Sequence, residues 1–227
     1  MNGKTVENPK TDDQLKVFEK FKSITTGQTL LTFTAPVEIV NRLSKVYDED
    51  ASTNLTDKKS IKSYSFTKNI FLDDDKKDNY NFIPDYIHEW IKDRIHQYLN
   101  FVNIPYMGIK PTLAWINDMT AGEYNEVHRH SGGWSSAFEN KVGLSILMGL
   151  KIPADMEKNT EGYHLHKDGW TEFIAVGNSQ QFVYPTTLIK LRERTCVVFP
   201  YDLLHHAYPH FSNQTRRTMS MNIDVFL

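Results

Sequence analysis

Seven of the nine histidines in this 227-residue chain fall into three short groups. Neutral imidazole nitrogen is a good ligand for borderline divalent metals such as Fe(II), and three protein ligands on one side of an ion leave its other positions open. The two remaining histidines lie eight residues apart on a predicted helix, with no other ligand type nearby. The chain therefore offers a candidate metal centre built from these groups: His128 and His130; His164 and His166; His205, His206 and His210.

The first group lies in residues 122–130, which read GEYNEVHRH. Side chains alternate along an extended strand, so this geometry places Glu126, His128 and His130 on one face. Two imidazoles of this face can reach one ion. The alternative is a pair of exposed or core histidines that bind nothing.

The last group follows an apolar run that ends at Phe199 and Pro200. A turn is expected after the proline, and His205 and His206 stand where the chain would enter the sheet again. Only one of two adjacent side chains can readily point at a given centre. This segment can therefore supply a third ligand from a distant strand.

The final segment, residues 216–226, alternates between two kinds of side chain. If its polar phase lines the interior of a barrel, the arginine can hold a carboxylate by charge-assisted hydrogen bonds of roughly 1.5 to 3 kcal/mol each. The alternative is an edge strand whose polar face is wet. One phase is apolar (Met219, Met221 and Ile223) and the other is polar (Arg216, Thr218, Ser220 and Asn222).

The elements around these residues are mostly β. A strand is predicted at residues 29–33, a helix after Pro36, and a longer amphipathic helix at residues 84–102. From residue 111 onward, short β-type runs are separated by turn residues, which indicates an antiparallel β domain. These runs are residues 112–116, 142–150, 172–176, 188–191, 195–199 and 218–226.

Composition restricts the class of protein. Hydrophobic residues make up 40% of the chain and charged residues 24%, as in an ordinary globular protein, and the net charge is −2. This balance argues against general nucleic-acid binding, and no apolar run is long enough to cross a membrane. The single cysteine, Cys196, sits in an apolar run and is expected to be a buried, reduced packing residue. We expect a cytoplasmic protein.

Four motifs in order resemble a group of 2-oxoglutarate/Fe(II)-dependent dioxygenases from bacteria and phages. They are G-x-Y-N-x-x-H-x-H, an L-S-x-x-x-x-L strand at residues 144–150, F-P-x-x-L-x-H, and R-x-[ST]-x-S-x-N. The resemblance covers residues 112–226, and residues 31–42 show a weaker similarity to the same group. It implies a mainly β (α+β) fold, the double-stranded β-helix or jelly roll, buttressed by N-terminal helices.

The resemblance also implies the site. His128, His130 and His205 would hold Fe(II), and Arg216 with Thr218 would bind the co-substrate 2-oxoglutarate. When Asn222 is aligned with the family's terminal asparagine, Arg216 and not Arg217 falls at the position of the 2-oxoglutarate-binding arginine. The charge of Arg217 is expected to reach solvent. The implied activity is an O₂-dependent oxidation, typically a hydroxylation, of an unidentified substrate.

The domain organisation that follows is a polar arm at residues 1–28 and one domain at residues 29–227. Within the domain, residues 29–110 supply helical support and residues 111–227 form the jelly-roll core. We expect a small-molecule or protein substrate of unknown identity, with a nucleobase also left open, and a homodimer through the long helix is one option. No membrane partner is expected.

The identity of the third ligand stays open at this point. The wider superfamily has a carboxylate where this chain has His130, so Glu126 or Asp168 is an alternative ligand. His166 and Asp168 match the H-x-D pattern of the wider superfamily. The preferred interpretation is that His164, His166 and Asp168 belong to an active-site loop. The role of His206 is open as well.

Two other functions fit part of the pattern. A metal-binding cupin shares the barrel and the H-x-H, but it needs a glutamate soon afterwards, and the first one here is Glu139. A non-enzymatic jelly roll, for binding or structure, needs no metal at all.

Overall fold

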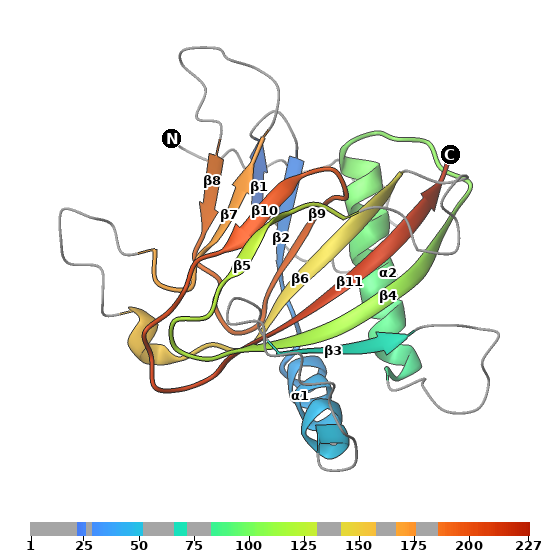
Figure 1. Ribbon diagram of the computed structural model, residues 1–227. Helices are drawn as coiled ribbons and strands as arrows, with labels where there is room; N and C mark the ends of the chain where they lie inside the picture. The colour runs from blue at the N-terminus through green and yellow to red at the C-terminus, as the bar shows by residue number, and fades with distance from the viewer. Residues whose placement is uncertain are drawn as a thin grey trace, which may run out of the picture.

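The computed structural model describes residues 22–25, 29–51, 66–71, 83–130, 142–157, 167–175 and 186–227. Two antiparallel β-sheets lie face to face, and the helices α1 (Val37–Ala51) and α2 (Asp85–Phe101) cover the outer face of the larger sheet (Figure 1). A short 3-10 helix, Ala154–Glu157, follows one of the strands. This arrangement is the predicted jelly roll with helical support.

The larger sheet has seven strands and the smaller has four. In spatial order, the larger contains β1 (Lys22–Thr25), β2 (Thr29–Thr34), β9 (Thr195–Pro200), β6 (Gly143–Lys151), β11 (Arg216–Phe226), β4 (Gly108–Met119) and β3 (Phe66–Phe71). The smaller contains β5 (Asn125–His128), β10 (Leu204–Ala207), β7 (Thr171–Ile174) and β8 (Thr186–Ile189).

The apolar stripe of α2 explains why this helix lies where it does. Its buried residues recur three or four positions apart, so they share one face and pack on the larger sheet. They are Ile87, Ile91, Ile95, Tyr98 and Leu99, together with Arg94. The helix predicted at residues 84–102 is confirmed.

Alternation along the strands creates two separate cores. In β9, Cys196 and Val198 belong to the core beneath the helices, whereas Val197 and Phe199 belong to the core between the sheets. The same rule divides β11: Met219 and Met221 belong to the core beneath the helices, whereas Arg216, Thr218 and Ser220 line the space between the sheets. Cys196 is fully buried, as predicted.

The β-type runs of the sequence became strands, and β5 and β10 formed in the two histidine segments, where an extended strand and a return to the sheet were expected. Strand β3 was not predicted, and residues 22–25, which the sequence places in the polar arm, form β1 and pair with β2. Residues 1–21 lie outside the described residues, and the division into arm and domain stays a prediction. No helix in the described part of the chain is long and apolar enough to cross a membrane.

Arg217 corrects one prediction. Its side chain is only 12% exposed and forms two hydrogen bonds with the carboxylate of Asp118, at 2.7 and 2.9 Å, and a third with Asp48 at 2.8 Å. The guanidinium also lies over the ring of Tyr47. A planar fork of donors suits this paired geometry, so Arg217 ties α1 to β4 and β11.

Replacing Arg217 with methionine should therefore destabilise the fold. We expect Arg217→Met to lower the free energy of unfolding by about 2 to 3 kcal/mol, because Asp118 is left largely buried without its cation. Urea denaturation measures the loss. Lys92→Met, which breaks the exposed pair with Glu89, is the control and should change stability little. Equal effects of the two substitutions would contradict a structural role for Arg217.

Candidate metal centre

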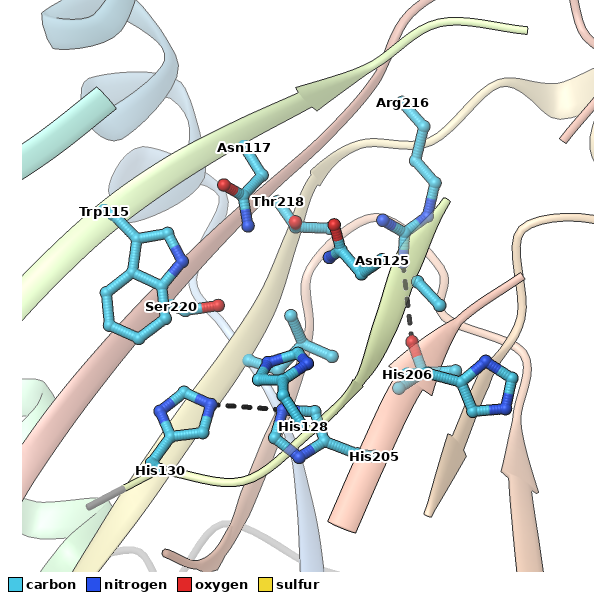
Figure 2. Close-up of a pocket in the computed structure, with 13 residues that line it drawn as sticks. Trp115, Asn117, Asn125, His128, His130, His205, His206, Arg216, Thr218 and Ser220 are labelled. Atoms are coloured by element: carbon cyan, nitrogen blue, oxygen red, sulfur yellow. Dashed lines mark hydrogen bonds between the residues drawn. The ribbon is translucent and has the colours of Figure 1, made fainter. Parts of the chain in front are cut away.

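A pocket with an empty volume of about 360 Å³ opens between the two sheets. Three histidines line one side of it, and Arg216 and Thr218 line another (Figure 2). The sheets therefore bring together the two parts of the site that the sequence predicts from segments far apart.

Pairing of β5 with β10 places two of the histidines. His128 and His205 are direct partners across this ladder, so their side chains lie on the same face. His130 follows two residues after His128, where its backbone N–H donates to the carbonyl of Tyr201 at 2.9 Å. One nitrogen from each of the three rings lies within 4.8 Å of the other two.

Each of these rings donates its Nδ1–H to an oxygen. The acceptor is the Glu126 carbonyl for His128 (2.7 Å) and the Leu203 carbonyl for His205 (2.9 Å). For His130 the acceptor is the Asn222 side-chain oxygen, at 2.6 Å. Because an oxygen of this kind cannot donate, the neutral rings carry their proton on Nδ1 and leave the lone pair of Nε2 free.

The free nitrogens meet at a distance that suits an ion. Nε2 of His130 lies 3.1 Å from Nε2 of His205. With both protons on the Nδ1 atoms, no hydrogen stands between these nitrogens, and two lone pairs repel. Metal–nitrogen bonds of about 2.1 Å at right angles would separate two ligand atoms by about 3.0 Å, so a divalent cation fits the pair.

Burial keeps two of these imidazoles neutral. It lowers the pKa of His130 to about 4, although the hydrogen bond with Asn222 acts in the opposite direction. Burial, followed by the nearby rings of His128 and His130, lowers the pKa of His205 well below its usual value. Neutral imidazole is the form that binds a metal, so no proton has to leave first.

The carboxylates considered as alternative ligands lie elsewhere. Asp168 is buried and accepts the backbone N–H of Phe211 at 3.0 Å, and the Glu126 side chain is exposed. Among the described residues, the potential ligand cluster contains the three histidines only. His164, His166 and Glu139 lie outside the described residues.

His206 points away from the cluster. Its Nε2 lies 3.1 Å from a carboxylate oxygen of Glu172, the residue opposite it on β7. His205, its neighbour in sequence, faces the interior because side chains alternate along β10. The structure thus places His205, the residue selected from the sequence, in the cluster.

Arg216 is the most unusual charge in the pocket. The side chain is 1% exposed, and its contacts are weak ones to the sulfur of Met119 (3.4 Å) and the hydroxyl of Thr171 (3.5 Å). Its Nε has no partner, and no carboxylate in the described part of the chain pairs with it. Burial alone lowers the pKa of the guanidinium to about 10. A buried cation without an anion is costly, so this end of the pocket is suited to a carboxylate.

Several residues in and beside the pocket were not predicted as functional. Asn222 was predicted to share the polar face of the last strand with Arg216 and Thr218, but no contact was assigned to it. Ser145 and Tyr201 were not singled out. Trp115, Asn117 and Asn125 line the pocket, and no sequence signal distinguishes them from ordinary strand residues.

Comparison with family models gave no match, and no curated protein matches the sequence. Solved structures do match. A Pseudomonas putida prolyl-4-hydroxylase is 12% identical with a TM-score of 0.52, over 87% of this chain and 91% of that chain. A Burkholderia pseudomallei oxidoreductase of the 2-oxoglutarate/Fe(II) oxygenase family is 13% identical with a TM-score of 0.56, over 86% and 84%.

A viral collagen prolyl hydroxylase from Paramecium bursaria Chlorella virus 1, solved with 2-oxoglutarate, is 13% identical with a TM-score of 0.53, over 87% of this chain and 96% of that chain. The matches cover most of both chains in each comparison. This chain therefore has the double-stranded β-helix fold of the 2-oxoglutarate/Fe(II) oxygenases to which it is similar.

Proposed function

We propose that this protein is a non-haem Fe(II) oxygenase that uses 2-oxoglutarate and O₂ to oxidise an unidentified substrate. The observation that carries the proposal is that a ring nitrogen from each of three histidines meets in the same pocket as a buried guanidinium that has no carboxylate partner among the described residues. The histidine cluster is suited to bind a cation, and the guanidinium is suited to bind an anion. Fe(II) and 2-oxoglutarate would supply this cation and this anion.

The proposed roles follow from these positions. His128, His130 and His205 would hold the iron, and Arg216 with Thr218 would hold the far carboxylate of 2-oxoglutarate. When bound, iron supplies the redox chemistry that couples 2-oxoglutarate decarboxylation to O₂ activation. The protein positions the two partners between its sheets.

The neutral ligand set has an electrostatic consequence. Three neutral imidazoles leave the full charge of a divalent ion in the pocket, whereas a carboxylate ligand would cancel part of it. Opposite charges attract strongly where water is excluded. A dianion such as 2-oxoglutarate, placed between this ion and the buried Arg216 guanidinium, would contact both cations and offset two of their three positive charges.

Arg216 also separates this proposal from the cupin alternative. A cupin has no 2-oxoglutarate to bind, so a buried guanidinium beside its metal would have no anion. The names of the similar structures include two prolyl hydroxylases, one of them in complex with 2-oxoglutarate, which supports the co-substrate. We further propose a cytoplasmic enzyme that acts on a small molecule or a protein and not on nucleic acid in general.

Binding of both partners gives a direct test. We expect anaerobic Fe(II) followed by 2-oxoglutarate to produce the weak visible charge-transfer band of a chelated complex. His130→Ala should abolish it because the lone pair that His130 contributes is lost, and His96→Ala, a histidine on α2, should retain it. Iron binding without the band would favour a cupin, and no stoichiometric metal would favour a structural barrel.

The two neighbouring arginines provide a matched pair for the co-substrate site. Arg216→Met should weaken 2-oxoglutarate binding roughly 100-fold, because about 3 kcal/mol of charge-assisted hydrogen bonding is lost. The metal-free variant should be at least as stable as the wild type, because a buried unpaired cation is removed. Calorimetric titration and urea denaturation measure the two effects.

Arg217→Met should do the reverse, with binding kept and stability lost, because Arg217 points to the other face of β11. If Arg216→Met bound 2-oxoglutarate as tightly as the wild type, the assigned role of Arg216 would be wrong.

Neutral buried histidines predict a pH dependence of the metal-free protein. The unfolded chain binds protons on His130 and His205 below about pH 6.5, whereas in the folded chain the pKa of His130 is about 4. Stability present above pH 6.5 is therefore lost as the pH falls toward 4, at up to about 1.4 kcal/mol per pH unit for each histidine.

Chemical denaturation between about pH 6 and pH 5 should show a flatter slope for His130→Gln than for the wild type, because glutamine does not titrate. Identical slopes would show that His130 is protonated in the folded protein.

A further inference from the structure

The three histidines of the cluster are held in two different ways. His128 and His205 each donate Nδ1–H to a backbone carbonyl two residues earlier, so their own segment fixes their orientation. His130 donates instead to the side chain of Asn222, which lies 92 residues further along the chain. The state of the His130 ring thus depends on a residue of the opposite sheet.

The side-chain oxygen of Asn222 is oriented by a second hydrogen bond. The hydroxyl of Ser145 donates to it at 2.8 Å, beside the 2.6 Å bond from His130. Ser145 and Asn222 are direct partners in the pairing of β6 with β11, and both are buried. With a hydroxyl donor on one side, this oxygen can serve as an acceptor for His130 on the other.

Other contacts hold the plane of the His130 ring. Trp115 stacks on it at 5.4 Å between centroids, and Phe199 meets it edge-on at 6.1 Å. The carbonyl of Tyr201 accepts its backbone N–H. These contacts fix where the ring lies, but they do not decide which ring nitrogen carries the proton. Asn222 makes that selection.

We infer that Asn222, oriented by Ser145, is the positioning residue that turns the Nε2 lone pair of His130 toward the metal. Accepting a proton from Nδ1 excludes the tautomer in which Nε2 is protonated and unable to bind an ion. This inference rests on the metal site of the proposed function.

The tautomer can be measured on the metal-free full-length chain. In ¹⁵N-histidine NMR spectra, with the His130 signals identified by their loss in His130→Gln, we expect wild-type His130 to carry its proton on Nδ1. Asn222→Leu removes the acceptor and should populate the tautomer protonated on Nε2. Asn222→Asp keeps an acceptor oxygen and should retain the wild-type tautomer.

Metal affinity provides a second readout, with Co(II) as the probe. We expect Asn222→Leu to bind Co(II) roughly 10- to 100-fold more weakly than the wild type, as for other residues that orient metal-bound histidines. Asn222→Asp should restore most of the affinity, and Ser145→Ala should cause a smaller loss. Met221→Leu, the next residue on the opposite face of β11, is the matched control and should change neither the tautomer nor the affinity.

The outcomes separate this inference from the proposed function. Wild-type protein that binds no Co(II) would overturn the metal site itself. Wild-type protein that binds Co(II) with Nε2 of metal-free His130 protonated, or an Asn222→Leu variant with wild-type affinity, would overturn the role of Asn222 and leave the metal site standing. If Asn222→Leu fails to fold, the role of Asn222 is tested by the tautomer of His130 in the wild type together with the Co(II) affinity of Ser145→Ala.

Discussion

The alternation of side chains along β11 is the constraint on which the rest of the structure depends. Its apolar phase completes the core beneath the helices, and its polar phase, from Arg216 to Asp224, faces the interior between the sheets. Because β4 and β6 pair with β11 on both sides, its register is fixed along most of its length. A slip of one residue would place the methionines in the pocket and the polar residues under the helices. The core and the site are therefore set by the same ladder.

That arrangement costs stability at the site. Among the described residues the buried Arg216 guanidinium has no carboxylate partner, and the Nε2 lone pairs of His130 and His205 lie 3.1 Å apart; both arrangements are unfavourable in the metal-free protein. Such local conflicts persist only where the surrounding structure determines the conformation, and they concentrate at functional sites. Here the two apolar cores on either side of the larger sheet supply that support. Arg217, one position along the strand, differs from Arg216 because its guanidinium is paired with the carboxylates of Asp118 and Asp48.

Sequence reasoning was strongest where a pattern is local. Period-two alternation predicted the strands and the polar face of β11, and the spacing of three and four predicted α2. It was weakest where two distant segments meet. The sequence left Glu126 and Asp168 open as ligands, and it expected Arg217 in solvent. Both questions depend on which residues oppose each other across the sheets, and periodicity assigns a face but not a partner. The role of Asn222 was hidden for the same reason, since its contact with His130 joins two sheets.

The way each histidine is held has a consequence for how metal binding and folding are coupled. His128 takes its acceptor from its own strand and His205 takes its acceptor from the residue just before β10, so the segments that form β5 and β10 can orient two ligands by themselves. The third requires the larger sheet, because only Asn222 on β11 selects the tautomer of His130. A ligand that binds the folded state alone stabilises it in proportion to the logarithm of its concentration above Kd. An ion held by all three rings would therefore stabilise the packing of one sheet on the other, through the contact between His130 and Asn222, and not just the strands that carry its ligands.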